Sequence, residues 1–397
     1  MDVRMAESMK IVFVSNYFNH HQSALSAALY RETKGEYFFI ATEEMPRERR
    51  ALGYGQEPVP EYVLYTYTTE EEYIRCQRLI NEADVVIIGS APEQLLRERK
   101  KAGKIIFRYS ERPLKKGFQA IKYFPRLLRW HSCNPMNRPI YMLCSSAYTA
   151  FDYAKFGLFR DRSYKWGYFP EAKRYDIEKL FSLKRNKTQK ILWVGRLLEW
   201  KHADHVVLVA ERLKQAGYHF EVDFIGVGEL EQQIAEMICE RDLEDCVRLL
   251  GSMKPEEVRQ HMECANIYLF TSDRQEGWGA VLNESMNSGC AVVASHAIGS
   301  VPFLIRDGEN GLVYESGNID MLCEKVKYLL ERPEEQKKLG CAAYQTITEL
   351  WSAENAAARL NELLIEVLSG EKNPELFADG PCSKAEILAE DWFQRER

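Results

Sequence analysis

The chain alternates between short apolar runs and longer segments with helical periodicity. In the first half the short runs are rich in β-branched and aromatic residues, and they are continuously apolar rather than alternating. Such runs are typical of parallel strands buried on both faces of a sheet. The pattern predicts an α/β half with strands at Lys10–Ser15, Tyr37–Ala41, Tyr62–Thr66, Asp84–Gly89, Lys104–Tyr109 and Ile140–Cys144.

A second alternation of this kind begins at Lys190–Val194, after residues 171–188 lose their periodicity and become charged, which predicts a linker. Further strands are expected at Glu221–Ile225, Val247–Leu250, Asn266–Phe270 and Ala291–Ala294, and helices at 229–241, 255–265 and 280–288. The chain is thus predicted to form two doubly wound, Rossmann-like domains, 1–170 and 189–352, that face each other across a cleft. Helices expected at 353–368 and 383–396 form a tail, 353–397, that could return to the first domain.

The composition is that of an ordinary globular protein, and a length of 397 residues suits two domains. No apolar run approaches the ~18 residues of a membrane-spanning helix, so a cytoplasmic protein is expected. The ten cysteines include no Cys-x-x-Cys pair, which argues against a zinc site and against a disulfide framework.

Charge is distributed unevenly along the chain. The net charge of −6 hides a basic first half, with 31 Lys and Arg against 22 Asp and Glu in residues 1–185. Residues 97–129 carry 12 basic residues against Glu98 and Glu111, interleaved with aromatic residues. This stretch suits an anionic membrane surface at the inner face of a membrane or a lipid-linked acceptor, or else a solvated face that also lines the cleft. The negative net charge argues against nucleic-acid binding.

Glycines and carboxylates are concentrated between the strand Asn266–Phe270 and the helix at 280–288. Glu276-Gly277-Trp278-Gly279-Ala280 precedes this helix, and Glu284 lies within it. Glycines let a backbone approach a ligand, and a helix start offers free N–H groups to phosphate. Because open α/β sheets bind ligands at the carboxyl ends of their strands, this segment is a candidate diphosphate site. The same residues could also form a polar loop with its helix cap.

Two other strand ends carry residues that suit the same ligand. The strand Lys190–Val194 ends in Gly195-Arg196, with Lys201 soon after, which supplies two cations for phosphate. The strand Glu221–Ile225 ends in Gly226-Val227-Gly228, a glycine turn that lacks the full dinucleotide fingerprint. The convergence of these segments predicts a diphosphate-binding site in the second half.

These motifs resemble family 4 of the retaining GT-B glycosyltransferases, the glycosyl transferases group 1. The resemblance spans roughly residues 190–330 and rests on Val194-Gly195-Arg196-Leu197 with Lys201, Gly226-Val227-Gly228, Glu276-Gly277-Trp278-Gly279 with Glu284, Gly289 to Ala294 and Ile305 to Val313. It implies the GT-B architecture. It also implies transfer of a sugar from a nucleotide-sugar donor, with uridine as the prior for the base, to a glycan or lipid-linked acceptor.

The resemblance further implies a role for each motif. Arg196, Lys201, Gly277, Trp278, Gly279 and Ala280 would hold the donor diphosphate, while Glu284, Gly226 and Gly228 would hold the nucleoside. Glu276 would contact the transferred sugar as a catalytic residue. The chain contains no Asp-x-Asp, which agrees with a site that uses cations in place of a metal, and no other cofactor is expected. No carboxylate nucleophile is assigned, so the implied mechanism is a same-face attack with the leaving phosphate as base.

The first half departs from the family pattern. A Gly-Gly turn usually follows the first strand, but this chain has Asn19, His20 and His21 before a helix, and where a histidine often follows a later strand it has Glu111 and Arg112. His20 and Glu111 are catalytic candidates, and Asn19, His21 and Arg112 are acceptor-side candidates. The histidines could equally form a polar turn, and Glu111 with Arg112 a surface ion pair.

Two alternative functions stay open. A GT-B isomerase or phosphorylase would share the donor site, and a non-catalytic GT-B partner subunit would explain the departures in the first half. Nicotinamide-dependent oxidoreduction would need a glycine fingerprint after the first strand, and the segment from Asn16 to Gln22 contains no glycine.

Overall fold

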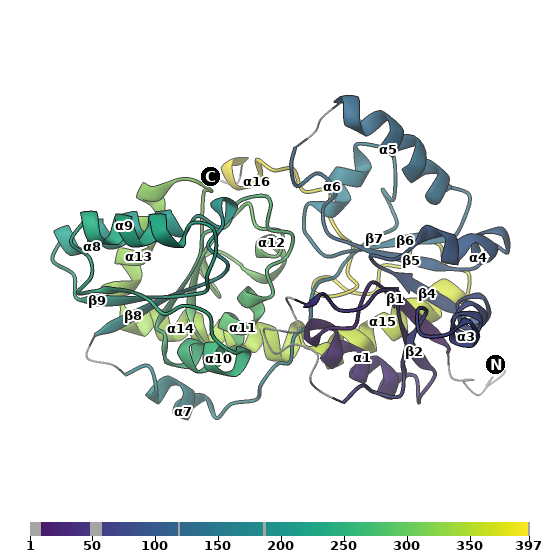
Figure 1. Ribbon diagram of the computed structural model, residues 1–397, viewed down its shortest axis with the longest axis horizontal. Helices are drawn as coiled ribbons and strands as arrows, with labels where there is room; N and C mark the ends of the chain where they lie inside the picture. The colour runs from purple at the N-terminus through teal and green to yellow at the C-terminus, as the bar shows by residue number, and fades with distance from the viewer. Residues whose placement is uncertain (1–8, 48–57, 118–119, 186–187, 396–397) are drawn as a thin grey trace. The chain divides into compact units, whose positions relative to one another are not determined.

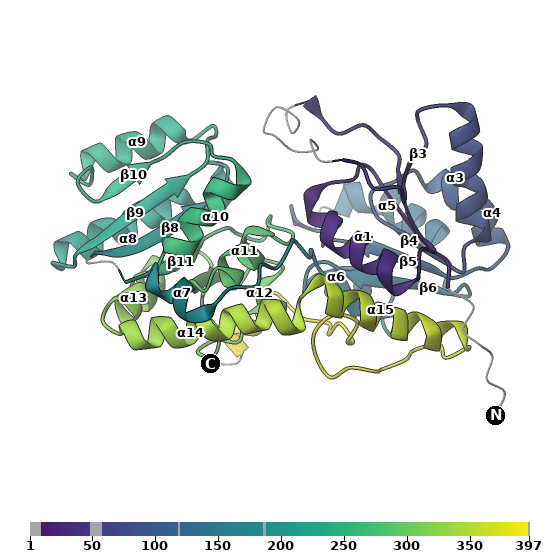
Figure 2. The ribbon, with the colours of Figure 1, turned by 90° about the horizontal axis from the view of Figure 1, so that it is seen from below.

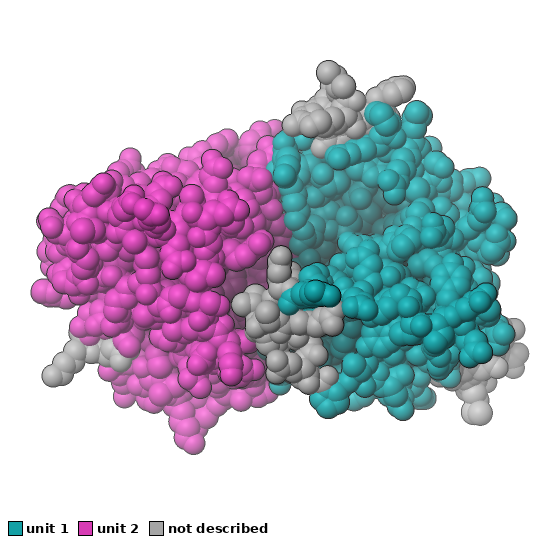
Figure 3. Space-filling view, viewed as in Figure 1, with its two compact units in different colours: residues 1–171, 352–389 teal, residues 172–351, 390–397 magenta. Residues whose placement is uncertain are grey.

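The computed structural model describes residues 9–47, 58–117, 120–185 and 188–395 and divides into two compact units. The first unit comprises residues 1–171 and 352–389, and the second comprises residues 172–351 and 390–397 (Figures 1 and 3). Residues 171–188, the expected linker, contain the helix α7 (Ile177–Ser182) and join the second unit from Ala172 onward. No helix among the described residues is long and apolar enough to cross a membrane.

The seven-stranded sheet of the first unit is parallel, with the order β3-β2-β1-β4-β5-β6-β7. The inner strands β1, β4 and β6 are buried along their whole length, which is why their sequences are continuously apolar. The predicted strands are confirmed, and the three-residue strand β7 was missed. The strands are β1 (Ile11–Ser15), β2 (Tyr37–Ala41), β3 (Val63–Tyr65), β4 (Val85–Ile88), β5 (Ile106–Ser110), β6 (Ile140–Cys144) and β7 (Ser163–Lys165).

Helices cover this sheet from both sides. Cys76 and Ile80 of α3 belong to one core cluster with Val12 and Val14 of β1. The helix α1 lies alongside α15, so the chain returns to the first unit after leaving it (Figure 2). The helices are α1 (His20–Glu32), α3 (Glu70–Glu82), η1 (Glu93–Leu96), α4 (Arg97–Lys101), α5 (Ala120–Cys133), α6 (Thr149–Ala154) and α15 (Ala353–Leu368).

The second unit is built in the same way around a six-stranded parallel sheet of order β10-β9-β8-β11-β12-β13. Its predicted strands are confirmed, and the short β13 was missed. The strands are β8 (Gln189–Val194), β9 (Phe220–Ile225), β10 (Val247–Leu249), β11 (Ile267–Phe270), β12 (Ala291–Ser295) and β13 (Leu312–Tyr314). The remaining helices are η2 (Glu199–Lys201), α8 (Ala203–Gln215), α9 (Glu231–Glu240), α10 (Pro255–Cys264), α11 (Val281–Asn287), α12 (Val301–Leu304), α13 (Ile319–Leu330), α14 (Pro333–Gln345) and η3 (Thr346–Leu350).

The strand order reverses beside the first strand of each sheet. In the first unit β1 lies between β2 and β4, and in the second β8 lies between β9 and β11. The connections leaving the two neighbouring strands therefore diverge at the carboxyl edge of the sheet. Each unit thus has the switch point at which open α/β sheets bind ligands.

The end of the chain differs from its prediction. A helix was expected over 383–396, but the described part contains only the short α16 (Trp392–Arg395). The backbone of residues 382–385 pairs instead with the edge strand β7, because the N–H of Cys382 donates to Lys165 and that of Lys165 donates to Ser383. An edge strand has free backbone groups to satisfy, and their pairing overrides helix propensity here.

Candidate active site

Two loops cross closely at the carboxyl ends of β8 and β9. A Cβ atom on Gly226, whose φ is +134°, would lie 1.9 Å from the carbonyl oxygen of Gly195, and one on Gly228 would lie 2.3 Å from that of Leu197. The N–H of Gly195 donates to Ile225 at 3.0 Å. The packing of one loop on the other therefore requires both expected nucleoside-site glycines, whatever they contact in a ligand. It also fixes the backbone that carries Arg196.

An ion pair joins the loops that follow β8 and β11. The ammonium of Lys201 contacts the carboxylate of Glu276, and the two side chains are only 12% and 10% exposed. The hydroxyl of Ser272 donates to the same carboxylate at 3.0 Å. Because β8 and β11 are neighbours, two residues 75 positions apart in the sequence meet at the switch point. The guanidinium of the exposed Arg196 makes no hydrogen bond or ion pair with any described residue.

The carboxylate of Glu284 lies in an environment that disfavours its charge. Burial raises the pKa of Glu284 above its ordinary value, against the opposing effect of the Arg259 charge. No described side chain or backbone group donates a hydrogen bond to this carboxylate, whereas its own carbonyl oxygen accepts one from Arg259. Tyr268 is close enough that the charges of Glu284 and Glu276 add to the burial that raises its pKa. A desolvated acceptor of this kind suits a ligand that brings hydroxyl donors.

The glycine-rich loop before α11 is held mainly by its own packing. The side chain of Trp278 is fully buried, with Nε1 donating to Asn283 Oδ1 at 2.8 Å, and its ring packs beside Trp351. This side chain is therefore part of the core and cannot contact a diphosphate. Gly279 has a φ of +79°, and a Cβ atom there would lie 2.3 Å from Phe270 Cζ. Gly277 and Ala280 flank these two residues, and Ala280 is the residue before α11.

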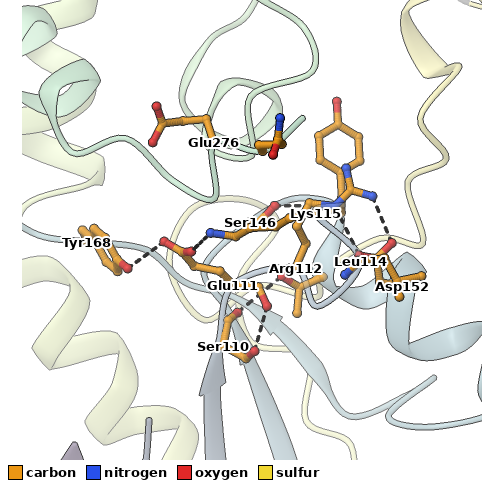
Figure 4. A network of polar contacts seen from close by, with 12 residues as sticks. Ser110, Glu111, Arg112, Leu114, Lys115, Ser146, Asp152, Tyr168 and Glu276 are labelled. Carbon is orange, nitrogen blue, oxygen red and sulfur yellow. Dashed lines mark hydrogen bonds and ion pairs between the residues drawn. The ribbon is translucent and has the colours of Figure 1, made fainter. Parts of the chain in front are cut away.

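A polar cluster lies at the carboxyl edge of the first sheet. Glu111, which follows β5, contacts the ammonium of Lys115 and accepts a hydrogen bond of 2.7 Å from the hydroxyl of Tyr168 (Figure 4). The ring of Tyr168 stacks on His21 with centroids 6.0 Å apart, and the rings of His20 and His21 are 3.7 Å apart. The structure thus brings together Glu111, His20 and His21, which come from different strand ends.

Asn19 has a structural role in this cluster. Its side-chain oxygen accepts a hydrogen bond of 2.9 Å from the N–H of His21, which caps α1 at the expected helix start. The cap places both histidines in the first turn of α1, and Asn19 is itself half-buried.

Arg112, the acceptor-side candidate, is buried, and it does not form the alternative surface ion pair with Glu111. Arg112 is 2% exposed and forms two hydrogen bonds with Asp152, at 3.0 and 3.2 Å, while Asp152 also accepts from the N–H of Leu114 (Figure 4). The guanidinium lies over the ring of Tyr148. Successive residues point to opposite sides here, so Arg112 faces the interior while Glu111 faces the polar cluster.

The basic stretch 97–129 is only partly a surface. Arg99 is 1% exposed and donates to the backbone carbonyls of Ile80, Ala83, Asp84 and Ile105, which satisfies the end of α3. Arg99 and Arg112 are therefore buried and not available to bind a ligand. The side chain of Lys122 lies outside the described residues.

One group of metal-ligating side chains lies close together within the described chain. Donor atoms of His202, Asp204 and His205 all lie within 4.8 Å of one another, directly after Lys201. His202 Nε2 is 3.5 Å from Asp273, so this group has a carboxylate partner of its own. These residues had no place in the predicted site.

Several residues of both sites were missed from the sequence. Ser272 and Tyr168 carry no motif, and only their positions just beyond the carboxyl ends of β11 and β7 could have indicated them, while Tyr268 lies inside β11 and carried no such signal. Asp152 lies 40 residues from the arginine that it pairs with.

The fold is that of the GT-B glycosyltransferases. The chain superposes with a TM-score of 0.67 and 16% identity on Anabaena HepE in complex with UDP, covering 91% of this chain and all of that one. The lipopolysaccharide outer core galactosyltransferase WaaB matches with a TM-score of 0.65 and 18% identity over 90% of this chain and all of that one.

Residues 176–346 match the model of the family described as glycosyl transferases group 1, and this segment of the chain belongs to that family. The amylovoran biosynthesis glycosyltransferase AmsK of Erwinia amylovora is 36% identical over 138 residues, 34% of each chain. The poly(ribitol-phosphate) alpha-N-acetylglucosaminyltransferase of Staphylococcus aureus is 25% identical over 46% of this chain and 38% of its own length. The chain thus spans about a third of the first of these curated relatives and less than two fifths of the second.

Proposed function

We propose that this protein is a retaining glycosyltransferase that moves a sugar from a UDP-linked donor to a glycan or lipid-linked acceptor without a catalytic metal. The observation that carries the proposal is the buried ion pair of Lys201 with Glu276 at the switch point of the second sheet. The carboxylate of Glu284 lies near the same tyrosine, Tyr268, as that of Glu276, and Arg196 follows the strand β8. The family match over residues 176–346 and the similarity to AmsK support transfer as the reaction. The base is taken as uridine because HepE, a structural neighbour, was solved with UDP.

Each of these four residues would bind a particular part of the donor. Lys201 and Arg196 would neutralise the diphosphate, which gains negative charge as it leaves, so that a divalent ion is not needed for this step. Glu284 would accept hydrogen bonds from the two ribose hydroxyls, which supply the donors that its carboxylate lacks. Glu276, held by Lys201 and Ser272, would meet hydroxyls of the transferred sugar.

The acceptor would be handled by the first unit. Glu111 and His20 are the candidates to contact the acceptor hydroxyl, with His21 and Tyr168 holding them in place. In the proposed same-face reaction the acceptor oxygen bonds to the anomeric carbon as the bond to the phosphate breaks. The acceptor proton passes to the departing phosphate oxygen, so no protein nucleophile is required.

The proposed place of action is the cytoplasmic face of a membrane. The exposed cations Arg126 and Arg129 support it, since each Lys or Arg near an anionic leaflet contributes ~1 kcal/mol.

A thermal-shift screen with UDP, GDP and ADP tests the donor site. UDP at a hundred times its Kd stabilises the protein by ~2.7 kcal/mol, and a protein of this size should melt several degrees higher. Equal and negligible shifts with all three nucleotides would argue against a nucleotide-sugar site.

A further inference from the structure

A cavity of about 300 Å³ lies in the first unit at the carboxyl ends of β4 and β5, next to α5. Its wall includes Gly89, which follows β4, and Tyr109 and Ser110 at the end of β5. The ring of Trp130 and the side chains of Ile88 and Met142 form an apolar part. This volume is at the lower end of the range for small-molecule sites, so it suits a phosphate or one sugar phosphate rather than a whole glycan.

The charge around this cavity is positive. Its one acid, Glu93, accepts two hydrogen bonds of 2.7 Å from Arg108 and one of 2.7 Å from Lys100. Burial alone would raise the pKa of Glu93, but these two cations lower it below its ordinary value, so the carboxylate is ionised and already compensated. Arg126 and Arg129 also line the cavity and stand three residues apart, on one face of α5. Arg129 forms no ion pair with any described residue.

A second cavity of about 440 Å³ continues this surface. It shares Glu93 and Cys133 with the first and adds Arg97, Lys100 and Arg138. Among the described residues that line the two cavities, Glu93 is the only acid. The two cavities together therefore present an excess of cations to any ligand that enters them.

The first cavity also adjoins the polar cluster that would handle the acceptor. Ser110 lines the cavity, and its hydroxyl donates to the carbonyl oxygen of Glu111 at 2.7 Å. The ring of Tyr109, which also lines the cavity, lies beside that of Tyr168 with centroids 6.2 Å apart. The cavity wall is thus directly connected to the backbone of Glu111 and to the tyrosine that holds its carboxylate.

We propose that this cavity binds a phosphate group of the acceptor substrate, with Arg126 and Arg129 as its ligands. The proposal rests on the proposed function and deepens it, because it makes the acceptor a phosphate-bearing sugar or lipid rather than a neutral glycan. Trp130 would pack against the apolar or sugar portion next to that phosphate. Arginine suits this task because its planar fork donates two parallel hydrogen bonds to phosphate oxygens.

Inorganic phosphate is the probe, and the donor site is first saturated with UDP so that phosphate cannot bind Arg196 and Lys201. Binding is then followed by calorimetry in wild type, Arg129→Gln and Lys116→Gln. Each variant loses one positive charge from the same basic stretch, but Lys116 is exposed and lines neither cavity. We expect Arg129→Gln to weaken phosphate binding by about ten- to a hundredfold, the range for one lost charge-assisted contact, while Lys116→Gln matches wild type.

A second arm separates a free phosphate from a lipid headgroup. Phosphatidylglycerol vesicles are added to the UDP-saturated protein, with and without inorganic phosphate. A phosphate site in the cavity predicts that inorganic phosphate competes with the vesicles, and that Arg129→Gln weakens the binding of both phosphate and vesicles. Equal weakening by the two variants, no phosphate binding beside UDP, or vesicle binding that phosphate leaves unchanged would overturn the proposal. UDP binding is recorded for each protein, so that a failure of the donor site is seen separately.

Discussion

Replacing Glu276 with glutamine should separate sugar transfer from nucleotide binding. The carboxylate of Glu276 holds Lys201, and both side chains are about nine-tenths buried, so little solvent screens their attraction. In the proposed function, donor phosphate competes with Glu276 for this ammonium. Hydrogen bonds to charged groups contribute ~1.5–3 kcal/mol, and part of this is released when the carboxylate becomes an amide. We therefore expect Glu276→Gln to bind UDP about tenfold more tightly, since ~1.4 kcal/mol corresponds to one decade.

The rate of sugar transfer by this variant should fall, although its affinity for UDP rises. Glutamine cannot place a negative charge against the hydroxyls of the sugar, and loss of one electrostatic contact of this kind costs ~10²–10³ in turnover. The unliganded variant should also melt a few degrees lower, because Lys201 keeps its charge but loses its partner, and ~1 kcal/mol shifts the melting temperature by ~2–4 °C in a domain of about 150–250 residues.

Calorimetry with UDP, thermal melting and a transfer assay measure the three effects, with Glu309→Gln as the control. Glu309 is 70% exposed and only weakly paired with Arg306, at 3.9 Å, so its substitution should leave all three unchanged. A Glu276→Gln variant that binds UDP more weakly than wild type would refute the competition between carboxylate and phosphate for Lys201.

Three further predictions concern residues with different roles. Glu284→Gln should weaken UDP binding by about ten- to a hundredfold, as one charge-assisted contact is lost. The same substitution should nevertheless stabilise the unliganded protein near neutral pH. Because the folded state raises the pKa of Glu284 above its ordinary value of 4.5, wild type loses stability as pH rises from 4.5 through the raised pKa, whereas the glutamine variant does not. Melting temperatures of the two proteins that stay parallel over this pH range would contradict this. Gly226→Ala should lower the free energy of unfolding by ~3 kcal/mol or more, because the new methyl group would clash with the backbone of Gly195. The control Gly251→Ala is also at positive φ but has nothing within 4 Å, and should cost ~1 kcal/mol. Equal urea midpoints for the two variants would count against the contact between the loops. Arg112→Met should lower the free energy of unfolding by ~3–5 kcal/mol, since it leaves Asp152 buried without its cation. Glu111→Gln should unfold at nearly the wild-type urea concentration but lose sugar transfer. The reverse result, a stable Arg112→Met without transfer and an unstable Glu111→Gln, would contradict these roles.

The second sheet and its site could be predicted because periodicity and motif point to the same place. Continuous apolar runs predicted the strands, and the rule that carboxyl ends of parallel strands meet at one edge predicted that Lys201 and Glu276 lie together. The strand β7 was missed because Ser163 and Lys165 leave it without an apolar run, and β13 was missed because Leu312 and Val313 were assigned to a loop of the family pattern. The tail helix expected over 383–396 was wrong, since pairing with the edge strand β7 depends on tertiary structure that no local sequence reveals.

The first unit shows where this reasoning ends. Its candidates His20, His21 and Glu111 do lie together, but the contact that joins them comes from Tyr168, 57 residues beyond Glu111. The cations of 97–129 looked equivalent in the sequence, yet Arg99 caps a helix end in the interior and Arg112 is buried against Asp152. Charge counts along a sequence do not distinguish buried cations from exposed ones, because burial is set by the fold.

The central claim is that the second unit activates a UDP-sugar for transfer without a metal. The most direct test is to incubate the protein with UDP-sugars and a phosphate-bearing acceptor in EDTA, follow release of UDP, and determine the anomeric configuration of the product by NMR. We predict UDP release that depends on the acceptor, is undiminished by EDTA, and gives a product with the configuration of the donor. Activity that EDTA abolishes and a divalent ion restores would contradict the claim and would direct attention to His202, Asp204 and His205.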